Sequence, residues 1–373
     1  MFMNNKVRLF ELMNRVSGMP LNEIDWETEY SDVDKTCMNP NELKEYLNSV
    51  LANHELPSSK RTKSDLLIHN KAIPFDEQGE IDVASFIKNI TQIPPEIISS
   101  NGKMEKTSAG DRVTYNIGVP ALRGLVYDID NTTFYVVNTC PGAGTCVPVC
   151  YARKGNYVTL ANVFVKQTRV LNLLLNDSDL FQKLLLNELE RVCLENRGKS
   201  VFFRWDDAGD FFTKRYFEIA LNITKKLKAM GYNFESYAYT KMGDIFNTND
   251  PDFLMSFSTD ASAIERGKVD LEKSKTGSIV PKILFGDLFS RKGPHFDVDA
   301  NGNLMPLNTN SIDTLKQRLS DKYKVPIDTI LTYNEMLNIP EGGDKKWSVI
   351  VTTKDGDISA QRKDVLKTLL LVH

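Results

Sequence analysis

The chain contains 373 residues, with 46 Lys and Arg against 49 Asp and Glu, which gives a formal net charge of −3. This near-neutral balance argues against nucleic-acid binding over the whole surface. With 41% hydrophobic and 25% charged residues, the composition excludes wholesale disorder. No apolar run of about 18 residues predicts a membrane span, and the N-terminus lacks the basic and apolar segments of a secretory signal.

Residues 1–110 are predicted to form a mainly helical accessory region. Apolar residues recur at helical spacing in three segments, at about 5–16, 41–53 and 82–91. Polar segments connect them, and residues 101–112 are polar enough to be a linker.

Residues 111–373 are predicted to form an α/β domain. Short apolar runs alternate there with segments of helical periodicity, which indicates a parallel sheet with right-handed crossovers. The runs lie at 134–137, 201–203, 234–239, 253–257, 283–285 and 347–351.

Polar or charged residues directly follow five of these apolar runs, at 138–140, 206–207, 240–241, 258–260 and 352–354. In βα sheets and barrels, functional groups gather at the C-terminal ends of the strands. The pattern therefore predicts one shared functional face. The alternative is that polar residues merely end each strand.

The five cysteines are too sparse for a disulfide scaffold and are odd in number, which indicates a reducing cytoplasm. Three of them fall within eleven residues, namely Cys140, Cys146 and Cys150. Cys193 lies on an apolar helical face and is expected in the core. Cys37, in the polar N-terminal region, reaches the other three only if that region folds over them.

The three clustered cysteines are predicted to bind a metal centre. Gly142 and Gly144 let the backbone turn, so that thiolates from one loop converge. A [4Fe–4S] cluster with three thiolate ligands and one open iron fits the spacing better than structural zinc, because no C-x2–4-C knuckle is present. Zinc with a His or Asp as fourth ligand remains the alternative, as do three thiols without metal. His295 and His373 are the plausible histidine ligands.

An acidic segment follows the strand at 201–205. Asp206, Asp207 and Asp210 flank a glycine, and carboxylates at a strand end bind a ribose hydroxyl, coordinate a metal or move protons. We predict a catalytic role for Asp207 and Asp210 and a cofactor-binding role for Asp206. Alternatively, Asp210 caps the following helix.

Three further polar residues are candidates for the same face. Lys241 is predicted to be catalytic, by neutralising a phosphate or carboxylate, and Thr240 beside it to bind cofactor. Arg153, close to Cys150, is predicted to balance cluster charge or contact an anionic substrate. For the two basic side chains, a solvated surface position is the alternative.

Several of these segments resemble the phage "gene product 88" family. They are residues 115–121, 139–146, 150–155, 204–212, 237–241 and 359–373, so that the resemblance covers about 113–373. It implies a partial (β/α) barrel and a Cys-Tyr-Ala cluster loop similar to those of radical S-adenosylmethionine (radical SAM) enzymes. The loop spacing here is C-x5-C-x3-C, where those enzymes have C-x3-C-x2-C. Residues 274–294 contain no cysteine, so no second metal site is expected.

Together these features predict a phage-encoded iron–sulfur protein of the host-cell cytoplasm, with a radical-SAM-like partial barrel and a helical N-terminal appendage. If it is an enzyme, the expected chemistry is one-electron transfer at the open iron, with S-adenosylmethionine as a candidate cofactor. The alternative is a non-catalytic protein in which zinc or an iron–sulfur cluster orders the loop and which engages a host protein or nucleic acid. The substrate is not encoded in any recognisable motif.

Overall fold

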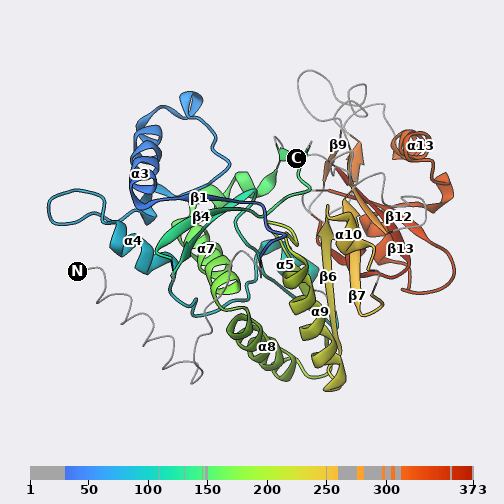
Figure 1. Ribbon diagram of the computed structural model, residues 1–373. Coiled ribbons are helices and arrows are strands. Elements are labelled where there is room, and N and C mark those ends of the chain that lie inside the picture. The colour runs from blue at the N-terminus through green and yellow to red at the C-terminus, as the bar shows by residue number, and fades with distance from the viewer. Residues whose placement is uncertain are drawn as a thin grey trace.

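The computed structural model describes residues 30–108, 110–129, 131–144, 146–147, 150–248, 250–258, 275–280, 296–298, 304–306, 312–352 and 355–371. These residues form a mixed α/β structure around an eight-stranded sheet, with a smaller three-stranded sheet beside it (Figure 1). No described helix is long and apolar enough to cross a bilayer.

The eight-stranded sheet is parallel at every pairing, which confirms the parallel sheet predicted from the sequence. Its first five strands lie in chain order: β2 (Arg112–Asn116), β5 (Ser200–Trp205), β6 (Phe234–Thr240), β7 (Phe253–Ser258) and β8 (Thr276–Val280). The order then reverses, through β13 (Val365–Leu371), β12 (Trp347–Val351) and β11 (Ile330–Thr332). The C-terminal ends of all eight strands therefore meet at one edge of the sheet.

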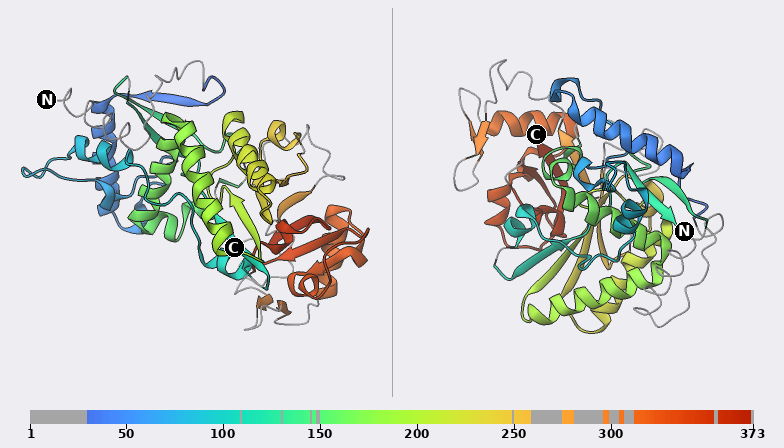
Figure 2. Two further views of the ribbon diagram at one scale, coloured as in Figure 1. Left: turned by 90° about the horizontal axis from the view of Figure 1, so that it is seen from below. Right: turned by 90° about the vertical axis from the view of Figure 1, so that its left-hand side faces the viewer.

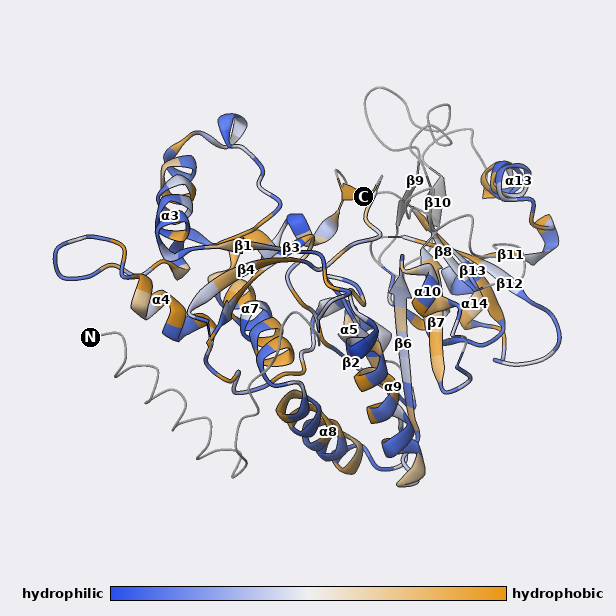
Figure 3. Ribbon diagram, viewed as in Figure 1, coloured by the Kyte–Doolittle hydropathy of each residue, from blue (hydrophilic) through white to orange (hydrophobic). Residues whose placement is uncertain are grey.

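Helices cover both faces of this sheet, as a parallel sheet requires (Figure 2). On one face, Phe203 and Trp205 pack in the largest hydrophobic core with α7 (Ala161–Asn176), α8 (Ser178–Glu195) and α9 (Lys214–Ala229). Helical periodicity was predicted between the apolar runs, and these three helices confirm it; Gly231 follows α9 with φ +85°. Figure 3 shows the apolar stripes of these helices alternating with polar ones.

The opposite face of the sheet includes a buried arginine, Arg204. Because side chains alternate along a strand, Phe202 and Arg204 of β5 point away from the large core. Short helices lie on this side, α5 (Gly102–Thr107) and α15 (Ile358–Gln361), and α15 contributes Ala360 to a small cluster with Phe202 and Tyr237.

The three-stranded sheet is antiparallel and pairs a strand of the N-terminal region with two strands from residues 123–138. Its order is β1 (Lys35–Met38), β4 (Thr133–Asn138) and β3 (Arg123–Asp128). The run 134–137 was expected in the parallel sheet, and that expectation is wrong, because the short connection after Asp128 folds β3 and β4 into an antiparallel pair. β1, from the predicted accessory region, pairs with β4, which lies beyond the predicted domain boundary at residue 110. The boundary itself stays a prediction.

The accessory helices follow their capping signals. α3 (Pro40–Glu55) begins after Asn39 in a capping box, and α4 (Val83–Ile90) begins after Asp82. Both pack in a core with Leu125 and Phe134, so the predicted helices at 41–53 and 82–91 are confirmed. The linker expected at 101–112 is wrong, because Asn101 caps α5 there and β2 follows.

Smaller elements complete the described chain. They are α6 (Asn156–Thr159), α10 (Gly243–Phe246), α13 (Ile312–Tyr323), α14 (Tyr333–Leu337), the β9 (Phe296–Val298) and β10 (Leu304–Pro306) pair, and 3-10 turns at Ser58–Lys60, Asn70–Ala72, Tyr151–Arg153 and Ile327–Thr329. The helix predicted at 5–16 and the strand predicted at 283–285 lie outside the described residues.

Candidate functional site

The cysteine loop begins where β4 ends and lies against the end of β6. The Asn138 side chain accepts a hydrogen bond from the Cys140 amide at 3.1 Å. A Cβ on Gly142 would come within 2.7 Å of the Lys241 Cβ and 2.8 Å of the Lys241 carbonyl oxygen. Only glycine permits this close approach, so Gly142 sets the distance between the cysteine loop and the C-terminal edge of the parallel sheet.

The three loop cysteines are partly buried and influence one another electrostatically. The Leu122 amide donates to Cys140 Sγ at 3.3 Å. Burial, followed by the Asp210 carboxylate, raises the pKa of Cys140 to about 12, while Lys241 opposes the shift. Burial also raises the pKa of Cys150, with a smaller contribution from Cys146. Without a metal, the Cys140 thiol is therefore protonated at neutral pH.

The described residues contain no group of three His, Cys, Asp or Glu side chains placed to hold a metal ion. Thr145, Pro148 and Val149 of the cysteine loop lie outside the described residues. The donor set has the chemistry of a thiolate centre, with a backbone amide aimed at one sulfur and a lysine near two. A metal would have to draw the three sulfurs together and displace their protons.

The other cysteines and histidines lie elsewhere. Cys193, on α8, is buried in the largest hydrophobic core, as expected. Cys37 is exposed on β1 and contacts the Thr133 hydroxyl at 3.2 Å. All five cysteines are free thiols. His295 and His373 lie outside the described residues.

Asp206 has an unusual backbone at the end of β5. Its φ of +54° is in the left-handed region, which a non-glycine residue rarely adopts. The Tyr216 hydroxyl donates to Asp206 Oδ1 at 2.9 Å, whereas Oδ2 is buried without a hydrogen-bond partner. Burial and the neighbouring Asp210 raise the pKa of Asp206 well above its usual value, so the neutral acid is favoured.

Asp207 is held from three sides through one oxygen. Oδ2 accepts hydrogen bonds from Asn116 Nδ2 at 2.5 Å, the Tyr157 hydroxyl at 2.9 Å and Asn101 Nδ2 at 3.3 Å. Oδ1 lies over Gly118, where a Cβ would come within 2.0 Å of it. Burial raises the pKa of Asp207, opposed by Arg204 and these donors. A carboxyl fixed this firmly is suited to moving a proton at a constant position.

Asp210 connects the acidic segment to β6. Its Oδ1 accepts from the Thr240 hydroxyl at 2.7 Å, and its Oδ2 accepts from the Lys241 amide at 2.8 Å. The structure therefore brings Asp210, Thr240 and Lys241 together, as predicted for one face. The alternative that Asp210 caps the next helix is wrong, because Thr213 caps α9.

Arg153 faces the accessory region. It donates to the Ser64 carbonyl at 3.0 Å and pairs with Asp65 at 3.2 Å. The side chain of Asp65 is 58% exposed, so this ion pair is weak. Its charge lies three residues beyond Cys150, and these contacts attach the end of the cysteine loop to the accessory region.

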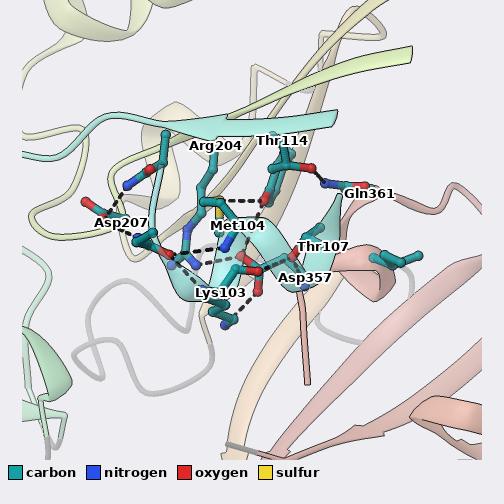
Figure 4. A network of polar contacts seen from close by, with 12 residues as sticks. Lys103, Met104, Thr107, Thr114, Arg204, Asp207, Asp357 and Gln361 are labelled. Atoms are coloured by element: carbon teal, nitrogen blue, oxygen red, sulfur yellow. Dashed lines mark hydrogen bonds and ion pairs between the residues drawn. The ribbon is translucent and has the colours of Figure 1, made fainter. Parts of the chain in front are cut away.

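An ion-pair network around the buried Asp357 carboxylate was not predicted (Figure 4). Arg204 Nη1 and Lys103 Nζ each lie 2.6 Å from a different oxygen of Asp357. Although burial opposes it, these two cations lower the pKa of Asp357 to about 2. The Asp357 carboxylate is therefore ionised at neutral pH.

Tyr151 links this network to both predicted site segments. Arg204 Nη2 donates to the Tyr151 hydroxyl at 3.2 Å, and that hydroxyl donates in turn to the Asp207 carbonyl. Tyr151 directly follows Cys150. The cysteine loop, the acidic segment and the ion pairs are thus one connected group at the C-terminal edge of β2, β5 and β6.

Only one member of this network could be singled out from the sequence. Arg204 lay in a family-like segment, but nothing in the spacing linked it to Lys103, which sits in the supposed linker, or to Asp357. Lone charged residues like these two are usually solvated, and only the fold brings them to Arg204, 101 and 153 positions away along the chain.

Part of the chain matches a known protein family. Residues 96–279 match the family described as gene product 88. The chain is similar to that family over this segment. The matched part includes the cysteine loop, the acidic segment and strands β2 to β7, so the resemblance expected from the sequence is confirmed there. Similarity to radical SAM proteins is not among the findings, and no curated protein and no solved structure matches the chain.

Proposed function

We propose that this protein is an iron–sulfur protein in which Cys140, Cys146 and Cys150 hold a [4Fe–4S] cluster. The observation that supports it is the position of the cysteine loop: three partly buried thiols lie on one glycine-containing loop, against the C-terminal ends of parallel strands. In this proposal, the parallel strands β2, β5, β6, β7 and β8 form an open, partial (β/α) barrel of radical SAM type.

The surrounding residues have definable roles in this proposal. The Leu122 amide and Lys241 offset the negative charge of thiolates at Cys140. Asp207, fixed by its three donors, holds or accepts a proton next to the site, and Asp206 stays neutral. When bound, a three-thiolate cluster would supply one-electron chemistry at its open iron, and S-adenosylmethionine is the candidate cofactor.

The direct test is anaerobic purification with iron and sulfide assays and electron paramagnetic resonance. We expect about four irons and four sulfides per chain and loss of the ~400 nm absorbance in Cys140→Ala. The matched control is Cys37→Ala, since that thiol is exposed on β1 and should keep the cluster. Stoichiometric zinc without iron would contradict the proposal. Formation of 5′-deoxyadenosine from S-adenosylmethionine and a reductant would identify an enzyme.

A second candidate function is a non-catalytic metal-stabilised binding protein. It is favoured by the absence of a preassembled ligand group among the described residues, since a metal would then order the loop on binding. The partner would be a host protein or nucleic acid. Metal-dependent protection of the loop from proteolysis, without any 5′-deoxyadenosine, would support this candidate. The proposed location for both is the host-cell cytoplasm, where free thiols persist.

A further inference from the structure

The guanidinium of Arg204 is buried but incompletely paired. Only 6% of the residue is exposed. Nη1 is bound to the Asp357 carboxylate at 2.6 Å, and Nη2 donates to the neutral Tyr151 hydroxyl at 3.2 Å. Nε is buried and has no hydrogen-bond partner among the described residues. A buried charged donor without an acceptor is costly, so it calls for a ligand or another explanation.

The unsatisfied atom lies on the part of the side chain best suited to anions. Nε and Nη2 present two parallel N–H groups, which we call the side edge of Arg204. A carboxylate or phosphate accepts both of these donors at once, with good geometry and the strength of a charge-assisted pair. At present the side edge holds one neutral hydroxyl and no anion.

The surroundings suit a small anionic ligand. Arg204 is in register with Asn116 of β2 and Tyr237 of β6, close to the C-terminal ends of the strands, where ligands of parallel sheets bind. Lys103, whose side chain is 40% exposed, shares the single Asp357 carboxylate with Arg204. The Asp357 carboxylate is thus shared, and neither cation has it to itself.

We propose that the side edge of Arg204 is a binding site for an oxyanion, the carboxylate or phosphate group of a small-molecule ligand, and that Tyr151 occupies the site until the ligand displaces it. Tyr151 is 44% exposed and belongs to no hydrophobic core cluster among the described residues, so its ring can move outward; its buried hydroxyl would then give up its hydrogen bonds with Arg204 Nη2 and the Asp207 carbonyl. Because Tyr151 follows Cys150, the bound group would lie beside the cysteine loop. The inference does not depend on the proposed metal centre.

The test uses metal-free full-length protein labelled with 15N-arginine, titrated separately with inorganic phosphate and with acetate at constant ionic strength. Nuclear magnetic resonance observes each arginine Nε–H directly, and the Arg204 signal is assigned by its loss in Arg204→Lys. We expect a saturable shift of that one signal. The anion that binds more tightly identifies the ligand class.

Two variants make the result specific. Arg204→Lys keeps a cation for Asp357 but lacks the side edge, so saturable binding, followed by calorimetry, should be lost. Tyr151→Phe removes the competing hydroxyl, so the anion should bind about 2- to 10-fold more tightly. Arg215→Lys, at an arginine whose side chain is 47% exposed on α9, is the matched control and should bind as wild type does.

The proposal is overturned if neither anion shifts the Arg204 signal, or if Arg204→Lys binds as tightly as wild type. If Arg204→Lys does not fold, Tyr151→Phe decides, because equal or weaker binding in that variant contradicts displacement of the hydroxyl. Loss of metal binding in other variants would leave this result unaffected.

Discussion

Removing the charge of Asp357 is predicted to lower the stability of the fold strongly. Its side chain is 2% exposed and pairs with Arg204, 8% exposed, and with Lys103, 40% exposed. Asp357→Asn retains the shape but removes the charge that two cations share. Arg204 then remains buried without a counter-ion, which is the costly way to break a buried pair.

The expected loss can be worked out in two ways. Lowering the Asp357 pKa from 3.8 to about 2 corresponds to about 2.5 kcal/mol of favourable interaction with the ionised form. Removing one partner of a buried pair costs about 3–5 kcal/mol, because it also strands the other charge. Lys103 is partly solvated and recovers hydration, so we expect a loss near the lower values, about 3 kcal/mol at pH 7.

Urea unfolding monitored by tryptophan fluorescence measures this loss, since Trp205 is fully buried next to Arg204. The folded pKa is lowered, so the stabilisation is complete above the unfolded pKa, near 4, and disappears as pH falls through about 2. The two proteins should therefore converge between pH 4 and pH 2. Asp328→Asn is the control, in an exposed pair with Lys345, and should change stability by less than about 0.5 kcal/mol. A loss below about 1 kcal/mol at pH 7, or no convergence in acid, would refute the reasoning.

Three further outcomes are expected. Gly142→Ala should destabilise the fold by about 1–3 kcal/mol in thermal unfolding and weaken metal uptake, because its Cβ meets the Lys241 backbone; Gly102→Ala, with open space around it, should do neither. In metal-free protein, iodoacetamide should alkylate exposed Cys37 first, and the Cys140 rate should rise about tenfold per pH unit between pH 7 and 10, since burial raises its pKa to about 12; a plateau near pH 8, read by peptide mass spectrometry, would contradict that pKa. Burial lowers the pKa of Lys275 to about 7, so unfolding free energy should increase from pH 7 to 9, by up to about 1.4 kcal/mol per unit. Lys275→Met should flatten that increase, and an unchanged slope would show that another group causes it.

Elements with a strong local signal were predictable from sequence. The helices at 41–53 and 82–91 carry both apolar periodicity and capping residues, and the runs at 201–203, 234–239, 253–257 and 347–351 became strands of one parallel sheet. The run at 134–137 looks the same in isolation. This run pairs instead with β3, through a short turn, and with β1, far upstream in the chain. Its apolar periodicity carries no information about which strands it pairs with.

In the candidate site, too, residues with a local sequence signal could be predicted and residues that depend on long-range contacts could not. Asp207, Asp210, Thr240 and Lys241 could be grouped in advance, because residues after parallel strands share one edge. Lys103 and Asp357 could not, because each is a single charge in a polar segment and acquires its role only from long-range contacts. The metal-binding role of the three cysteines and the oxyanion site at Arg204 stay predictions that the experiments above decide.

The position of β13 has a consequence for how the molecule is made. It follows every other described strand in the chain, yet it lies between β12 and β8 and is the pairing that connects β11 and β12 to the rest of the sheet. During synthesis β2 to β8 can associate in the order in which they emerge, whereas β11 and β12 must wait. A chain stopped before residue 365 would expose two unpaired strand edges, which favour aggregation, so the sheet can close only after β13 has been synthesised.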